Sequence, residues 1–190
     1  MDNREKIMQC AEELFYSRGY DAAGVQEIVE RAGVTKPTLY YYFGSQRGLL
    51  EAILETKAVG LWKNIREETK KPGDIRSKLH ALAEALYQFF MTQRKFYMLL
   101  MALFYSAREN EAYQTVRPYL MEFYRSVVQL FEHASGELGN MRGRQEQFAI
   151  SFIGAIHQYL VMAWDQGILE RDGGVQMEEL VNQFLYGIFS

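Results

Sequence analysis

The chain has 190 residues, of which 48% are hydrophobic, and it carries a formal net charge of −3. This size and apolar content are sufficient for a folded core, which argues against a disordered chain. No apolar run approaches the roughly 18 residues that a membrane span needs, and the charged N-terminus does not resemble a signal peptide. A single cysteine, Cys10, excludes an internal disulfide, so we expect a cytoplasmic protein with no membrane partner.

Two amphipathic helices are predicted first. The first covers residues 4–18 and ends at Gly19, and Cys10 lies on its apolar face, which favours a structural role over a redox one. The apolar face of the second comprises Val25, Ile28, Val29 and Ala32. Gly33 is expected to end this second helix, because glycine adopts the left-handed conformation needed there at the least cost.

A short aromatic helix is predicted over residues 36–43, with the sequence Lys-Pro-Thr-Leu-Tyr-Tyr-Tyr-Phe. Thr35 is a suitable N-cap, and the proline falls in the first turn, where its missing N–H breaks no hydrogen bond. Leu39 and Phe43 are four residues apart and face inward together. The helix then exposes tyrosines beside a lysine, which suits a DNA groove, because hydroxyls donate to phosphates and rings contact thymine methyls.

The alternative is that the tyrosines at 40–42 are core aromatics of a helical bundle, and it is strongest for Tyr40, which borders the apolar side. The charge distribution favours DNA. No acidic residue lies between Glu30 and Glu51, whereas basic residues are present at Arg31, Lys36 and Arg47. We therefore expect salt-sensitive DNA binding with a low non-specific affinity.

Together these motifs resemble the DNA-binding domain of the tetracycline-repressor (TetR-type) family of bacterial transcriptional regulators. The matching segments are residues 11–15, 19–20, 25–28, 32–34, 38–43 and 49–50. The resemblance covers roughly the first third of the chain. It implies an all-helical dimer whose second domain binds a small molecule that releases or alters DNA binding.

The resemblance also implies which residues contact DNA. On the aromatic helix these are Lys36, Pro37, Thr38, Tyr40, Tyr41 and Tyr42. Gln26 points outward where the preceding helix crosses the DNA backbone, and Gln46 and Arg47 lie at the next helix N-terminus, which favours phosphate. Three positions depart from the family pattern. Gly24 weakens a cap, Val25 offers no side-chain hydrogen bond to phosphate, and Gln46 stands where a lysine is common.

A single helix over residues 45–70 is predicted to join two domains, ending at the Lys-Lys-Pro-Gly sequence of residues 70–73. We expect a helix-turn-helix domain over 1–46, with a family-type extent of about 1–61, and an effector-binding and dimerisation domain over 47–190. Further helices are predicted over 75–94, 95–105, 115–133, 145–166 and 178–189, with Pro118 starting or kinking the third of these. The shared helix can act as a lever between effector and DNA.

The last two predicted helices are apolar on most sides, so we expect them to form half of a four-helix dimer interface. The predicted interface residues are Phe148, Phe152, Ile156, Leu180, Phe184 and Ile188. Two DNA-binding domains in one dimer require a pseudo-palindromic operator on double-stranded DNA.

The middle helices are rich in methionine and aromatic residues, which form adaptable apolar cavities, although core packing also explains any one of them. The predicted pocket residues are Tyr87, Phe90, Met98, Met101, Phe104, Tyr105, Tyr119, Phe123 and Tyr159. Ionisable candidates, each alternatively a surface or satisfied core group, are His80, His157, Arg117 and Glu122. We expect a small, largely apolar effector of aromatic or acyl type.

An enzyme is not predicted, and no cofactor or metal is expected. The histidines at 80, 133 and 157 are scattered, the cysteine stands alone, and neither a Gly-rich phosphate loop nor a nucleophile motif occurs. The sequence therefore predicts a dimeric, effector-controlled repressor, because a lever most simply exchanges DNA-bound and DNA-free states. The alternative is a helical small-molecule carrier or interaction module without DNA binding.

Overall fold

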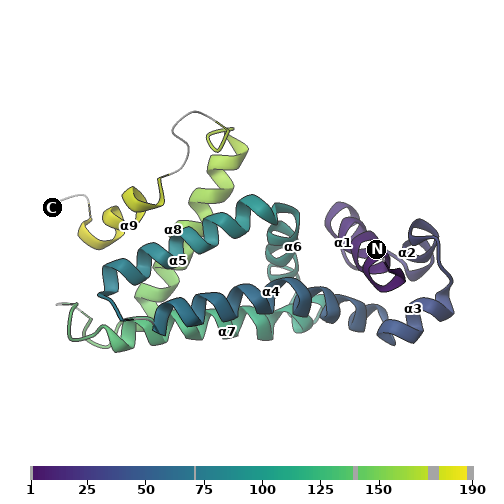
Figure 1. The fold of residues 1–190 in the computed structure, drawn as a ribbon, viewed down its shortest axis with the longest axis horizontal. Coiled ribbons are helices and arrows are strands. Elements are labelled where there is room, and N and C mark those ends of the chain that lie inside the picture. The colour runs from purple at the N-terminus through teal and green to yellow at the C-terminus, as the bar shows by residue number, and fades with distance from the viewer. Residues whose placement is uncertain (1, 71, 139–140, 171–175, 188–190) are drawn as a thin grey trace. The chain divides into compact units, whose positions relative to one another are not determined.

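A computed structural model describes residues 2–70, 72–138, 141–170 and 176–187. Within these ranges all regular secondary structure is helical, which confirms the predicted all-α class (Figure 1). The helices are α1 Asn3–Arg18, α2 Val25–Ala32, α3 Lys36–Phe43, α4 Gln46–Lys70, α5 Ile75–Thr92, α6 Arg94–Phe104, α7 Glu111–His133, α8 Gln145–Asp165 and α9 Met177–Tyr186. No helix in the described part of the chain is both long and apolar enough to cross a membrane.

The helices form two compact units. The first unit contains Met1–Gly60 and Gln93–Met121, and the second contains Leu61–Thr92 and Glu122–Ser190. Helix α4 contributes to both units. Helix α6 and the start of α7 belong to the first unit together with the N-terminal helices, and α6 contacts α1.

The first unit is organised around α1, which contacts α2, α3 and α6. A capping box starts α1: the Glu5 backbone N–H donates to the Asp2 carboxylate, and the Asp2 N–H donates to the Glu5 side chain. The buried core of this unit includes Ile7, Ala11, Leu14, Phe15, Ile28, Leu39, Leu50 and Ile53. Three N-terminal helices are thereby fixed to one another by apolar contact.

The caps around α3 and α4 differ from the sequence prediction at one place. Thr35 makes no side-chain cap bond, and its hydroxyl lies 2.9 Å from the Thr38 hydroxyl instead. Ser45 caps α4, since its Oγ accepts a hydrogen bond from the Gly48 N–H at 2.9 Å. Gly24 offers α2 no side-chain cap, as its missing side chain requires.

The later helices begin close to the predicted positions, with one exception. The Asp74 carboxylate accepts a hydrogen bond from the Ser77 N–H at 2.8 Å and thereby caps α5. Helix α7 begins at Glu111, earlier than predicted, because the Asn110 side chain accepts from the Ala112 N–H at 2.7 Å. Pro118 consequently lies inside α7 and does not start it.

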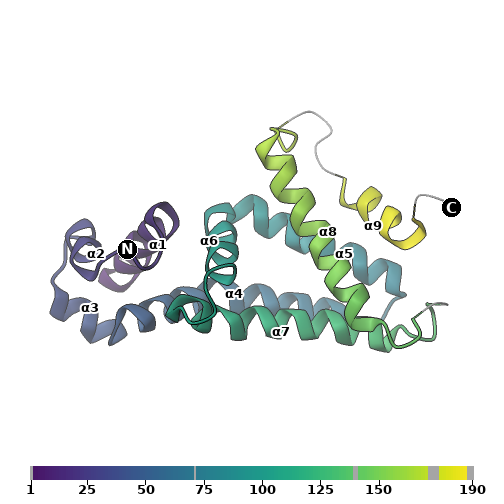
Figure 2. The same cartoon turned by 180° about the vertical axis from the view of Figure 1, so that it is seen from behind.

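Aromatic rings cluster in the second unit, in which α5 contacts both α8 and α9 (Figure 2). One cluster joins Phe131 of α7 to Phe148 and Phe152 of α8 and Phe184 of α9, with ring centroids 5.0 to 6.4 Å apart. Another cluster is built on Trp62 of α4. The aromatic cluster at Phe131 therefore attaches α9 to the rest of this unit.

The imidazole of His157 on α8 makes stability depend on pH. Its burial lowers its pKa below the ordinary value of 6.5. As the pH falls through about 6.5, His157 binds a proton in the unfolded chain but not yet in the folded chain. We therefore expect the free energy of unfolding to fall. Urea unfolding between pH 8 and pH 5.5 should show this decline in the natural protein and in His133→Gln, which alters an exposed histidine. A decline of the same size in His157→Gln would contradict the assignment of this pH dependence to His157.

Candidate nucleic-acid interface and effector-binding residues

Helices α2 and α3 form a helix-turn-helix. Gly33 ends α2 in the left-handed conformation, with φ 66° and ψ 35°, and the Val34 N–H donates to the Val29 carbonyl at 3.0 Å. Helix α3 then packs inward through Leu39, which is fully buried. This arrangement leaves the opposite side of α3 open to solvent.

The tyrosines of α3 lie on that open side. Tyr41 is 84% exposed, Tyr40 47% and Tyr42 40%, so the alternative that they are core aromatics is wrong. The rings of Tyr41 and Tyr42 meet edge to face, with centroids 5.3 Å apart. Lys36 and Pro37 are exposed at the start of the same helix, and Thr38 is half-buried. The six predicted residues of α3 therefore share one short helix.

The three predicted DNA contacts outside α3 already have partners within the protein. The Gln26 amide donates to the Glu30 carboxylate, and the Gln46 amide donates to the Tyr20 carbonyl at 2.9 Å. Arg47 pairs with Glu51 at 2.9 Å, and this hydrogen bond raises the pKa of Arg47. These side chains must exchange a partner before they bind phosphate.

Sequence reasoning missed Arg4 of α1. Its guanidinium carbon lies 5.7 Å from the centre of the Phe43 ring, at the C-terminal end of α3. Such a contact is a cation–π interaction and brings a positive charge beside the exposed tyrosines. No pattern in the sequence indicates it, because the two residues are far apart along the chain.

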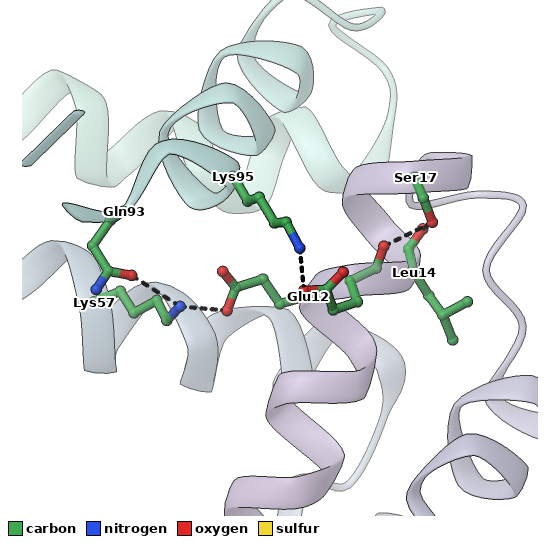
Figure 3. Close-up of polar contacts among 7 residues, drawn as sticks. Glu12, Leu14, Ser17, Lys57, Gln93 and Lys95 are labelled. Atoms are coloured by element: carbon green, nitrogen blue, oxygen red, sulfur yellow. Dashed lines mark hydrogen bonds and ion pairs between the residues drawn. The ribbon is translucent and has the colours of Figure 1, made fainter. Parts of the chain in front are cut away.

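Polar contacts tie α1 to α4, α6 and the start of α7. Glu12 pairs with Lys57 at 2.5 Å, Lys57 also donates to Gln93 at 3.1 Å, and Lys95 pairs with Glu13 at 2.6 Å (Figure 3). Further along, the Tyr20 hydroxyl donates to Glu111 at 2.7 Å and the Asn110 amide to Asp21 at 2.6 Å. Burial, together with the bond to Glu111, raises the pKa of Tyr20, so its hydroxyl stays protonated.

The predicted pocket residues are distributed over both compact units. Met98, Met101, Phe104, Tyr105 and Tyr119 belong to the first unit, and Tyr87, Phe90, Phe123 and Tyr159 belong to the second. Phe90 and Phe123 are buried, whereas Tyr105 is 72% exposed and Tyr159 38% exposed. Phe104 stacks on Tyr113, with centroids 5.8 Å apart.

The ionisable candidates have ordinary surroundings. Arg117 is exposed, Glu122 is exposed and pairs with Arg66, and His80 and His157 are half-buried.

Burial raises the pKa of the Cys10 thiol, which keeps it protonated and agrees with a structural role. Among the residues that the structure describes, no group of His, Cys, Asp or Glu could hold a metal ion.

The predicted dimer residues lie mostly inside the second unit. Phe152 and Ile156 are each 1% exposed in the single chain, so the unit's own core accounts for their burial. Phe148, Leu180 and Phe184 are half-buried, and Ile188 lies outside the described residues. The solvent-exposed side of α8 instead carries Ile150, Gly154 and Met162, with open space around Gly154.

This geometry defines a helix-turn-helix protein, in which a short exposed helix follows a buried one across a glycine turn. The family described as "Bacterial regulatory proteins, tetR family" matches residues 7–53, which contain all of α2 and α3. Residues 7–53 are therefore the DNA-binding domain of this family of transcriptional regulators. The resemblance seen in the sequence is thereby confirmed. So is the exclusion of an enzyme, because the family is one of regulators.

Two relatives and one solved structure illustrate the similarity. The "HTH-type transcriptional activator FasR" of Mycolicibacterium smegmatis is 36% identical over 52% of this chain, which spans only 45% of that relative. The "Uncharacterized HTH-type transcriptional regulator YvkB" of Bacillus subtilis is 27% identical over 83% of this chain and 80% of its own. The structure of "transcriptional regulator FadR from Bacillus subtilis in complex with stearoyl-CoA" shares the fold, with a TM-score of 0.77 and 17% identity over 97% of this chain and 98% of that one.

Proposed function

We propose that the protein is a dimeric, sequence-specific repressor whose binding to a pseudo-palindromic operator is controlled by a small, largely apolar effector. The observation that carries this proposal is the exposed tyrosine face of α3, held in place by buried Leu39. Exposed aromatic rings with polar tips suit contact with sugars, thymine methyls and phosphates in the major groove. A carrier without DNA binding offers no reason to keep such a face in solvent.

The proposed effector is an acyl compound. The fold is shared with a FadR structure that contains stearoyl-CoA, a ligand with a long apolar chain. The methionine and aromatic residues of the middle helices suit such a chain, because they adapt their shape to apolar ligands.

The proposed route from effector to DNA runs through α1. Glu12 and Glu13 connect α1 to α4 and α6 within the first unit, and α1 in turn contacts α2 and α3. A displacement of α6 by the effector would therefore change the position of the helix-turn-helix. Two arrangements of one packed element are what effector control of DNA binding requires.

The proposed dimer face is the exposed side of α8. Ile150 is 59% exposed and Met162 41%, and Gly154 lies between them along the helix. A glycine flanked by apolar side chains allows a second helix to approach closely. In this proposal the exposed residues of α8 contact the partner, in place of Phe152 and Ile156, which are buried within their own chain.

Selection of bound duplexes from a random DNA pool, followed by affinity measurement on the recovered operator, tests the proposal. We expect a pseudo-palindrome, and we expect Tyr42→Ala to weaken operator binding by about 1–2 kcal/mol, the scale of a hydrogen bond to a charged group. Tyr16→Ala is the matched control, because Tyr16 is 39% exposed and lies on α1. Equal losses in both variants, or no enriched sequence from a folded dimer, would refute DNA recognition by α3.

The direction of regulation needs its own measurement. In transcription from a promoter that overlaps the recovered operator, we expect the protein to lower transcript yield and stearoyl-CoA to restore it. Increased transcript yield on addition of the protein alone would identify an activator, which is the role that the name of the FasR relative states.

A further inference from the structure

A buried indole in the second unit has an unusual environment. Trp62, on α4, is 4% exposed. Its ring stacks on Phe123 of α7, with centroids 4.7 Å apart and planes 20° apart, and lies 6.4 Å from the ring of Phe89 of α5. Aromatic rings from two other helices of this unit, α5 and α7, therefore lie against the indole.

The indole nitrogen of Trp62 is buried and has no hydrogen-bond acceptor among the residues that the structure describes. The indole N–H can only donate, and buried tryptophans usually find an acceptor. Leaving such a donor unpaired costs free energy on the scale of the hydrogen bond that it lacks. Buried polar groups without a protein partner are uncommon, and a ligand is one of their explanations.

We infer that the Trp62 N–H donates a hydrogen bond to the carbonyl oxygen of the effector's acyl group. The inference rests on the proposed function, because it identifies the acceptor on the acyl effector proposed above. An acyl thioester suits the site because it offers one neutral acceptor at the end of an apolar chain. The rings of Phe123 and Phe89 that lie against the indole are themselves uncharged.

A free carboxylate suits the site less well. The cation one turn further along the same face of α4 is Arg66, and it pairs with Glu122. A carboxylate brought to Trp62 would enter aromatic surroundings while Arg66 is already engaged with Glu122, and burying an unpaired charge is costly. The site therefore selects the thioester over the corresponding free acid.

A pair of ligands isolates the one bond at issue. Stearoyl-CoA has the carbonyl, and S-octadecyl-CoA has a methylene in its place and is otherwise the same. Calorimetric titration of the full-length protein should show about tenfold tighter binding of stearoyl-CoA, which corresponds to 1.4 kcal/mol. In Trp62→Phe, which keeps a stacking ring without the N–H, the two ligands should bind equally. The control Trp164→Phe should keep the tenfold difference.

A second measurement avoids mutation of the natural protein. The chain has two tryptophans, so its indole N–H groups give two resonances. Stearoyl-CoA should shift the Trp62 resonance downfield, and S-octadecyl-CoA should leave it in place. Equal affinity for the two ligands, or an unshifted Trp62 resonance with stearoyl-CoA bound, would overturn the role of Trp62 and leave the acyl effector intact. If neither ligand binds the natural protein, the acyl effector itself is refuted, and the inference with it.

Discussion

Replacing Gly48 with alanine is expected to lower the free energy of unfolding by about 3 kcal/mol, the upper range for overpacking a tight site. A β-carbon at this position would lie 2.0 Å from the carbonyl oxygen of Phe43. Both atoms belong to the junction between α3 and α4, where backbone cannot move aside without displacing the exposed tyrosines. We therefore expect Gly48→Ala also to weaken operator binding at temperatures where the variant is still folded.

Gly60→Ala is the matched control for this prediction. Gly60 lies on the same helix, α4, and its surroundings leave open space for a methyl group. Alanine there should raise stability by up to about 1 kcal/mol, because it is the better helix former. Urea unfolding followed by circular dichroism measures both variants, and a Gly48→Ala protein as stable as Gly60→Ala would contradict the close approach.

Replacing Lys57 with alanine is expected to cost about 2 kcal/mol of stability. Its ammonium group contacts Glu12 at 2.5 Å and Gln93 at 3.1 Å, and lies 5.5 Å from the centre of the Phe96 ring. The Glu12 side chain is only 13% exposed, so removal of the lysine leaves a largely buried carboxylate unpaired. Full burial would cost 3–5 kcal/mol, and the partial exposure of Lys57 reduces the expected loss to about 2 kcal/mol.

Lys95→Ala provides the comparison. Lys95 pairs at 2.6 Å with Glu13, which follows Glu12 in α1. The two side chains of that pair are 58% and 36% exposed, so we expect its loss to cost far less stability than the loss of Lys57. In addition, Glu12→Gln should recover part of the stability lost in Lys57→Ala, since it removes the unpaired charge. Equal losses of stability in Lys57→Ala and Lys95→Ala would show that burial does not make the Glu12–Lys57 pair the more important of the two.

The helix-turn-helix was predictable because its signals are local. Gly33 ends its helix through its own backbone conformation. Helices α4 and α5 start at side-chain caps on Ser45 and Asp74. Such signals lie in the sequence next to the helix end that they set. The cap at Thr35 failed because Thr38, three residues on, competes for the same hydroxyl. Helix α7 begins before the predicted residue 115 because the prediction overlooked Asn110 as a start signal.

The contacts that join distant segments could not be predicted. Nothing near Glu12 in the sequence points to Lys57, and nothing near Tyr20 points to Glu111. The same difficulty applies to the choice of dimer residues on α8. Periodicity identifies the apolar face of α8, but it does not say whether that face packs inside its own chain, as Phe152 does, or against a second copy.

The position of Glu12 and Glu13 in one turn of α1 has a consequence for physiology. Adjacent residues of a helix point about 100° apart, so the two carboxylates reach different helices, α4 and α6. Dissolved ions screen the exposed Glu13–Lys95 pair strongly and the enclosed Glu12–Lys57 pair weakly. A rise in salt concentration would then weaken the contact of α1 with α6 and leave its contact with α4 intact. The same ions weaken phosphate contacts, so a cell's salt balance would act on this regulator at two places at once.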